Sequence, residues 1–381
     1  MFSYRNLILG LTLGLLSMTL ANGQEPVKKD ERPRVEVVFV LDTTGSMTGL
    51  INAAKQKIWS ISNQISSGTP SPLVKIGLVA YRDRKDAYVT KVIDLNDDLD
   101  AIHGHLMGFH AAGGGDFPES VNQALHEAVT KISWSKDKKT LKMIFLVGDA
   151  PPHMDYPDDV KYPDTCKLAV KNDIIINAVQ CGDNADTKKY WLDISRGAEG
   201  SYVQIDATGG PVVATTTPYD ADLAKINVEI NKTQLLFGKK DAQVSGKLKL
   251  AESAALPAAA QADRAAFNAR NNAATAYDLV QQLKDGKVKL DELKKDELPQ
   301  ELQGKNVTEQ KEIVARIEQQ RLELSKKAIE LDKKRGEFIN KKLAEDTKNR
   351  ARDSFDNQVL QILQRQANRA NIQYGVDEKK K

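Results

Sequence analysis

Apolar and polar positions alternate along residues 34–237 in two rhythms, one typical of buried strands and the other of helices. Six short apolar runs predict strands at residues 35–41, 73–81, 89–93, 141–147, 174–181 and 201–205. Helical periodicity predicts helices at residues 50–65, 120–132 and 164–172. Because most strand runs are too continuous for one face to meet water, we expect an α/β fold, with a doubly wound, mainly parallel sheet covered by helices on both sides.

Residues 239–381 carry helical patterns alone. An alanine-rich stretch at residues 251–276 predicts a helix broken once at Pro257, and a final helix is expected around residues 355–363. Residues 309–346 predict one long charged helix. Its apolar residues at seven-residue spacing are Ile317, Leu324, Leu331 and Phe338. This single stripe predicts a partial coiled coil that packs against another helix of the same tail or against a sister chain.

The charge distribution also changes near residue 238. Residues 1–238 contain 25 basic and 29 acidic side chains, and residues 239–381 contain 30 and 23. We therefore expect two parts, a sheet domain at residues 34–237 and a charged helical tail at residues 239–381. Because the tail mixes both signs and the whole chain has a net charge of only +3, the composition argues against a nucleic-acid partner.

The chain begins with a pattern typical of a signal peptide at residues 1–23. Arg5 precedes an apolar run at residues 7–20, and Ala21-Asn22-Gly23 suits cleavage before Gln24. The run is short for a membrane span, which needs about 20 residues, and no later stretch is long and apolar enough. We expect export to the periplasm, the cell envelope or the medium, with no transmembrane segment after cleavage. The alternative is an uncleaved N-terminal anchor.

Two cysteines, Cys166 and Cys181, occur in a chain expected to be exported. Disulfides persist in oxidising compartments. A helix at residues 164–172 that packs antiparallel to the following strand places its start beside the end of that strand. This arrangement favours a disulfide between the two residues, and the alternative is a pair of buried thiols.

Oxygen-bearing side chains follow the first predicted strand. Asp42, Thr44 and Ser46 stand at alternate positions in a strand-to-helix loop, where one carboxylate and two hydroxyls can face a single centre. Such hard oxygen ligands suit Mg²⁺, Mn²⁺ or Ca²⁺ better than Zn²⁺. Residues 113–119 and 147–153 supply further oxygens at strand or helix ends, where ligands bind in parallel α/β sheets. Asp and Thr are also common turn residues, so the first motif alone is weak evidence.

Together these motifs resemble the von Willebrand factor type A domain, a doubly wound, Rossmann-like fold with a metal-ion-dependent adhesion site. The family motif Asp-x-Ser/Thr-x-Ser matches Asp42, Thr44 and Ser46, and the strand-terminal Asp of its last motif matches Asp149. The resemblance covers roughly residues 34–237. It implies that these four residues are metal ligands.

The middle motif departs from the common family pattern, because counting back from Ala124-Leu125 leads to Glu119 instead of a threonine. The Asp116-x-Pro-Glu119 sequence is similar to the variant in integrin β-subunits. This similarity implies that Glu119 is a ligand and that Asp116 either supports the site from outside or serves a second cation.

The resemblance implies a binding function. A divalent cation, Mg²⁺ in first place and Mn²⁺ or Ca²⁺ as alternatives, would keep one position open for an Asp or Glu carboxylate of a partner protein. A second hypothesis is a metal-dependent hydrolase that uses His153 or His110 as a base, although no hydrolase motif surrounds either histidine. A third is a scaffold in which the metal only joins loops. The basic loop at residues 81–85 either flanks the metal or forms a solvated turn.

Overall fold

The computed structural model describes residues 31–208, 216–271, 277–345 and 355–374. Residues from Glu31 onward form one compact unit. The expected signal peptide at residues 1–23 lies outside the described residues. Among the described helices, none combines the length and the apolar character needed to cross a membrane.

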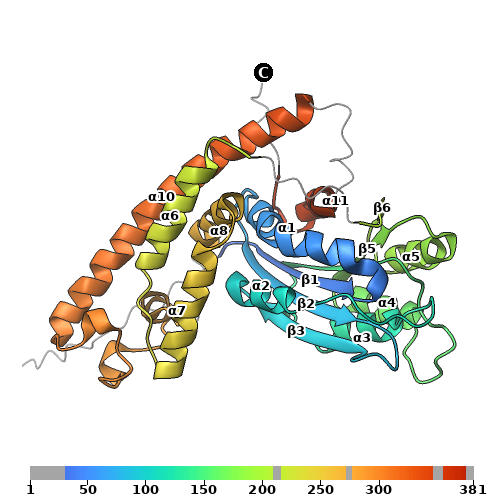
Figure 1. The fold of residues 1–381 in the computed structure, drawn as a ribbon, viewed down its shortest axis with the longest axis horizontal. Helices are drawn as coiled ribbons and strands as arrows, with labels where there is room; N and C mark the ends of the chain where they lie inside the picture. The colour runs from blue at the N-terminus through green and yellow to red at the C-terminus, as the bar shows by residue number, and fades with distance from the viewer. Residues whose placement is uncertain (1–30, 209–215, 272–276, 346–354, 375–381) are drawn as a thin grey trace, which may run out of the picture. The chain divides into compact units, whose positions relative to one another are not determined.

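A six-stranded sheet forms the centre of the fold, as the sequence predicted (Figure 1). The strand order is β3-β2-β1-β4-β5-β6, with β3 antiparallel at the edge and every other neighbouring pair parallel. The strands are β1 (Arg34–Asp42), β2 (Leu73–Tyr81), β3 (Thr90–Asn96), β4 (Thr140–Gly148), β5 (Ile174–Cys181) and β6 (Tyr202–Ile205).

The central strands are buried along nearly their whole length, which explains their continuous apolar sequences. Every residue of β4 and β5 is buried, because helices cover both faces of the sheet. The register pairs Asp42 with Tyr81, and Leu41 with Val147. The carboxyl ends of β1, β2 and β4 therefore meet at one edge of the sheet, where their loops build the candidate site.

Helices cover the two faces of the sheet in separate groups. One apolar cluster joins a face of the sheet to α1, α2 and α11, and the other joins the opposite face to α3, α4 and α5. The bounds of these helices are α1 (Thr48–Ser66), α2 (Leu99–Met107), α3 (Val121–Thr130), α4 (Tyr162–Lys171), α5 (Ala185–Gly197) and α11 (Phe355–Ala367). This two-sided cover confirms the doubly wound α/β prediction.

The disulfide prediction is wrong. Cys166 and Cys181 are both buried free thiols, and they belong to apolar clusters on opposite faces of the sheet. Side chains alternate between the two faces along a strand, and Cys181 faces the side of α1 while Cys166 in α4 packs on the other side. The sequence argument placed the two residues at the same level of the fold but did not determine the face.

A helical region follows the sheet domain. Its helices are α6 (Asp220–Lys232), α7 (Lys240–Ala254), α8 (Ala258–Asn271), α9 (Leu279–Lys284) and α10 (Val307–Glu345). Short 3-10 turns lie at Leu290–Glu292, Gln300–Leu302 and Asn368–Ala370, and one more lies in the sheet domain after β1, at Gly45–Met47. Pro257 lies between α7 and α8, as expected for a helix broken once. The alanine-rich α8 packs against α1, α6 and α10, since small side chains allow close approach on several sides (Figure 1).

The apolar stripe of α10 packs within the chain. Ile313 and Ile317 contact a cluster built around α9, and Ala328 and Leu331 contact a cluster with α6 and α8. The stripe thus meets α8 and α9 of the same tail, which is one of the two partners that the sequence left open, and it also meets α6, which precedes residue 239. Buried residues of α11 also join the main sheet cluster, so the helical region shares its core with the sheet.

Candidate metal centre

Asp42 ends β1 and is completely buried. Its Oδ1 accepts hydrogen bonds from the Thr44 backbone N–H (2.8 Å) and from Thr44 Oγ1 (2.6 Å), and Thr44 Oγ1 lies 3.4 Å from Ser46 Oγ. Asp42 Oδ2 has no hydrogen-bond partner among the described residues. The loop therefore gathers its carboxylate and two hydroxyls, as the spacing predicted.

The glycine-rich loop before α3 lies directly against this motif. Gly114 has φ +81°, and a Cβ there would lie 3.1 Å from both Glu119 Oε1 and Thr44 Cβ. Only glycine combines this backbone conformation with so close an approach. Glu119 is 3 % exposed, and its Oε2 also lacks a hydrogen-bond partner in the described part of the chain.

Backbone hydrogen bonds fix the position of Glu119. Its N–H donates to Pro151 O (2.9 Å), and the His153 N–H donates to Glu119 O (3.0 Å). These bonds join the loop before α3 to the loop after β4. Asp149 begins that second loop, and its backbone oxygen accepts a hydrogen bond from Thr187 Oγ1 (2.8 Å).

Burial raises the pKa values of three carboxyl groups at this edge. Burial raises the pKa of Asp42 to about 7. Burial, followed by the charges of Asp42, Asp83, Asp86 and Asp149, raises the pKa of Glu119 to about 9. Burial also raises the pKa of Asp149, against the hydrogen bond from Ser46. Removing several carboxylates from water without compensation is costly, so a cation at this point would be strongly favoured.

These residues fit a divalent cation. The two orphan oxygens, Asp42 Oδ2 and Glu119 Oε2, are buried acceptors without donors, and Thr44, Ser46 and Asp149 add neighbouring oxygens. All five side chains offer hard oxygen atoms, which Mg²⁺, Mn²⁺ and Ca²⁺ prefer. The structure thus brings the five predicted residues into one polar neighbourhood.

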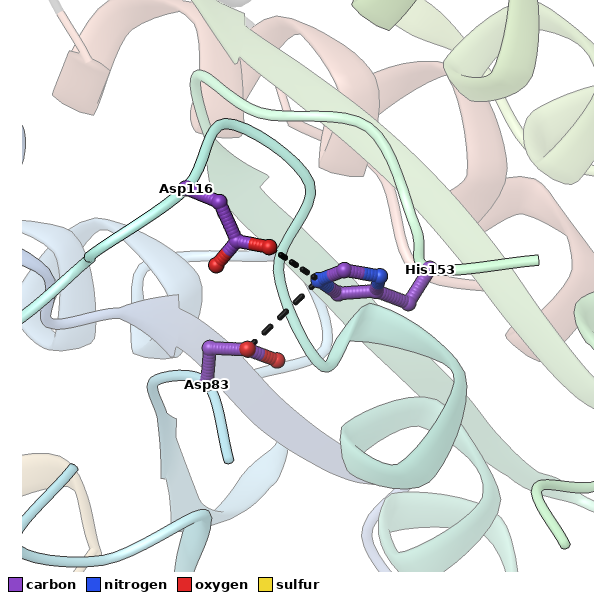
Figure 2. Close-up of side chains that lie close together, drawn as sticks. All are labelled: Asp83, Asp116 and His153. Atoms are coloured by element: carbon purple, nitrogen blue, oxygen red, sulfur yellow. Dashed lines mark ion pairs between the residues drawn. The ribbon is translucent and has the colours of Figure 1, made fainter. Parts of the chain in front are cut away.

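Asp116 faces a different group of side chains. Its Oδ2 lies 3.7 Å from His153 Nε2, which lies 3.5 Å from Asp83 Oδ2 (Figure 2). Asp83 was not predicted as a site residue. It stands between two arginines, so the sequence of this loop indicates a basic segment. A usable signal was present, since Asp83 follows β2 much as Asp149 follows β4.

The loop after β2 flanks the candidate site and is not a solvated turn. Arg82 is 7 % exposed, and its guanidinium donates to Thr43 O (3.1 Å) and His110 O (2.6 Å). Arg84 pairs with Asp158 and Asp159 in the loop after β4. Arg82 therefore joins the loop after β2 to the loops that contain Thr43 and His110, and Arg84 joins it to the loop after β4.

Two kinds of relative match part of the chain. The von Willebrand factor A domain-containing protein 7 of Rattus norvegicus is 37% identical over 123 residues, which cover 32% of this chain and 13% of that protein. A protein of Acanthamoeba polyphaga mimivirus described as ariadne-like, with a RING finger, is 21% identical over 204 residues, covering 49% of this chain and 20% of that protein. The chain thus spans about a fifth or less of the length of these relatives.

Solved structures that match part of the chain include a protein of the mussel byssus and the SpRpn10 VWA domain. The byssus proximal thread matrix protein 1, described with zinc in its metal-ion-dependent adhesion site, is 16% identical with a TM-score of 0.37, covering 45% of this chain and 42% of that one. The SpRpn10 VWA domain is 14% identical with a TM-score of 0.36, covering 49% of this chain and 99% of that one.

The family comparison agrees with the fold and with the loops at the sheet edge. The model described as von Willebrand factor A domain matches residues 36–217. This range contains β2 to β6, all of β1 except its first two residues, and every residue of the candidate metal centre. Residues 36–217 of this chain thus match the von Willebrand factor A domain in sequence, and they fold into a mainly parallel α/β sheet with helices on both faces.

Proposed function

We propose that residues 34–237 act as a metal-dependent protein-binding module. A divalent cation held by Asp42, Thr44, Ser46, Glu119 and Asp149 would accept a carboxylate oxygen from an Asp or Glu of a partner protein. The observation that carries this proposal is the pair of buried carboxylate oxygens without donors, Asp42 Oδ2 and Glu119 Oε2, at the ligand-binding edge of the sheet.

The side chains of this chain would hold and orient the cation. Thr44 fixes one oxygen of Asp42, and the backbone bonds of Glu119 hold its carboxylate beside the first loop. A bound divalent cation supplies positive charge that attracts an anion. Because Glu119 is a carboxylate where many family members have threonine, we expect firmer metal retention and a weaker pull on the partner's carboxylate. We propose Mg²⁺ as the resident ion, with Mn²⁺ and Ca²⁺ as alternatives.

We also propose a location for the protein and a role for its helical tail. The pattern at residues 1–23 supports export to the periplasm, the envelope or the medium. We propose that the helical tail spaces the module from other structures and offers a surface for self-association. Exposed apolar side chains on α10, Leu322 and Ile329, support the second role.

A metal titration and a pull-down test the proposal together. Wild type, Asp42→Ala and the control Asp193→Asn, which changes an exposed acid on α5, are compared by calorimetric titration with MgCl₂ and MnCl₂. We expect Asp42→Ala to lose metal binding while its circular dichroism spectrum stays native. Partners captured from the exported fraction should disappear with Asp42→Ala and with EDTA. Capture that survives both treatments refutes the proposal.

Two other hypotheses have distinct outcomes in the same experiments. If the metal only joins loops, EDTA lowers the melting temperature but leaves captured partners unchanged. If the protein is a hydrolase, a panel of ester and phosphoester substrates shows metal-stimulated turnover that His153→Ala abolishes.

A further inference from the structure

The imidazole of His153 is held in a buried position, and the backbone N–H of this residue bonds Glu119 O of the candidate metal centre. The residue is 4 % exposed, and its Nδ1 lies 2.8 Å from Asp155 Oδ1. Its ring stacks on Tyr156, with ring centroids 4.0 Å apart and an interplanar angle of 12°. Asn122 Nδ2 donates to its backbone oxygen (2.6 Å). The ring therefore has little freedom to turn.

The other ring nitrogen faces two carboxylates without bonding to either. His153 Nε2 lies 3.5 Å from Asp83 Oδ2 and 3.7 Å from Asp116 Oδ2, and it has no hydrogen-bond partner among the described residues (Figure 2). These distances exceed the 2.7–3.2 Å range that is usual for N–H···O bonds. A buried polar nitrogen in this state needs another partner.

The same distances suit a metal ion between the three groups. Zinc lies about 2.0–2.2 Å from His nitrogen and Asp oxygen in tetrahedral sites, so two such ligands are separated by about 3.3–3.6 Å. One ligand atom from each of Asp83, Asp116 and His153 lies within 4.8 Å of the others. The side chain of Asp116 is 64 % exposed, so it is free to move toward an ion held by the other two groups.

Asp83 is oriented as a ligand in a metal site would be. It is 3 % exposed, its Oδ1 accepts a hydrogen bond from Ser120 Oγ (2.8 Å), and its Oδ2 accepts one from the Tyr156 hydroxyl (2.7 Å). Hydrogen bonds of this kind hold ligating carboxylates in place around metals. The exposure of Asp116 leaves a route from solvent and room for a water as fourth ligand.

We propose that His153 Nε2, Asp83 and Asp116 form a second metal site that binds a first-row transition ion of the zinc class. An imidazole nitrogen with two carboxylates favours Zn²⁺ over Mg²⁺ and Ca²⁺, which prefer oxygen alone. None of these three residues belongs to the five oxygen ligands of the proposed adhesion site. The proposal thus goes beyond the proposed function and does not depend on a partner protein.

Asp155 acts as a positioning residue in this site. Its carboxylate faces Nδ1, which fixes Nε2 as the nitrogen free to bind the metal. We expect Asp155→Asn to weaken zinc binding about 10-fold while leaving the stoichiometry at one, because outer partners of ligating histidines contribute about 10- to 100-fold to metal affinity.

The test separates the two sites by using Asp42→Ala as the background. The metal-stripped full chain carrying Asp42→Ala is titrated with Zn²⁺ by calorimetry and with Co²⁺ by visible absorption, whose bands report a nitrogen and oxygen ligand field. We expect one equivalent of each ion to bind. Adding His153→Gln should lower the affinity at least 100-fold and remove the cobalt bands. The matched control His105→Gln, which changes an exposed histidine on α2, should have no effect.

Asp116→Asn is the second variant, because its exposed side chain can change without disturbing the core. We expect it to lower zinc affinity at least 10-fold with native circular dichroism and an unchanged melting temperature in EDTA. Zinc binding of unchanged affinity in both His153→Gln and Asp116→Asn overturns the proposal. So does the absence of zinc and cobalt binding in the Asp42→Ala background. Neither result bears on partner capture, so failure here is distinguishable from failure of the proposed function.

Discussion

Buried carboxylates occur both in the helical region and at the edge of the sheet, but they have different partners. Among the helices, Arg335 lies 2.7 Å from both Asp220 and Asp263, and Arg321 lies 2.6 Å from Asp278. At the sheet edge, no described lysine or arginine forms an ion pair with Asp42 or Glu119. The buried acids of the helical region are thus paired with arginines, whereas the arginines at the sheet edge, Arg82 and Arg84, bond other groups.

The difference shows how to separate structural charges from ligand sites. A paired buried carboxylate stabilises a packing arrangement or costs little, because its partner folds with it. A buried carboxyl group without such a partner either stays protonated or binds a cation from solution. The pKa values of Asp42 and Glu119 are raised because these carboxyl groups are buried and no described lysine or arginine forms an ion pair with them. A cation bound from solution would supply the missing positive charge.

The largest effect is expected from breaking the ion pair that joins α8 of the helical region to α2 of the sheet domain. Arg264 is fully buried and bonds Asp100 (2.6 and 2.8 Å) and the side-chain oxygens of Asn227 and Asn231. Arg264→Ala should lower the free energy of unfolding by about 3–5 kcal/mol, since it leaves a nearly buried carboxylate unpaired. Urea unfolding measures this, with the exposed Arg316→Ala as control. A loss under 1 kcal/mol would show that the pairs contribute little to stability.

Changing Asp42 should weaken metal binding strongly and change stability little, whereas changing Arg264 should lower stability. Asp42→Asn should weaken Mg²⁺ binding at least 100-fold, or about 2.7 kcal/mol. Without metal it should leave the free energy of unfolding unchanged or slightly higher, because it removes an uncompensated buried acid. Calorimetry and urea unfolding in EDTA check both parts. If the variant is strongly destabilised in EDTA, Asp42 has a structural role like that of the paired acids.

The stability of the metal-free protein should fall as pH rises. The folded-state pKa values of about 7 for Asp42 and about 9 for Glu119 exceed their ordinary values of 3.8 and 4.5. The folded state therefore binds more protons than the unfolded state in this window, and the free energy of unfolding decreases between about pH 4 and pH 9. We expect a loss of several kcal/mol between pH 5 and pH 9 in EDTA, since one pKa unit corresponds to about 1.4 kcal/mol.

Urea midpoints at pH 5, 7 and 9 measure this dependence. The double variant Asp42→Asn with Glu119→Gln should flatten it, and added Mg²⁺ should stabilise the wild type more at pH 9 than at pH 6, because the metal displaces protons. A midpoint that rises with pH in EDTA would contradict the assignment of unpaired acids to the sheet edge.

The smallest effect is expected for an exposed pair of the helical region. Lys334 lies 2.8 Å from Glu330 on the surface of α10, and both side chains are largely open to solvent. Lys334→Ala should change the free energy of unfolding by less than about 0.5 kcal/mol. Urea unfolding at low and high salt checks this value. A loss near that of Arg264→Ala would mean that burial does not explain the contrast between the pairs.

The fold was largely predictable from sequence because buried parallel strands require continuous apolar runs. All six strand predictions have counterparts in the sheet, including the edge strand at Thr90–Asn96. The pattern could not show that α11 packs on the sheet, since an amphipathic helix has a buried face whatever it meets. For the same reason, the stripe of α10 did not identify α6 and α8 as its neighbours.

The candidate site was predictable only where its residues follow a local motif. Asp42, Thr44 and Ser46 lie within one loop, so their spacing alone brings them together. His153 and Asp116 appeared in the sequence as separate possibilities, and Asp83 was missed between arginines. Only the meeting of three loops shows that these side chains share one point.

By itself, the amino-acid sequence determined the six strands, most of the helices and the first loop of oxygen ligands, because each depends on contacts between residues close in the chain. It did not predict α5 (Ala185–Gly197). The tertiary structure decided which face each side chain meets and which distant groups share a space. It separated Cys166 from Cys181 across the sheet and supplied arginines to the acids of the helical region. It also left Asp42 Oδ2 and Glu119 Oε2 without hydrogen-bond donors among the described residues. These outcomes depend on long-range packing, which periodicity along the chain does not record.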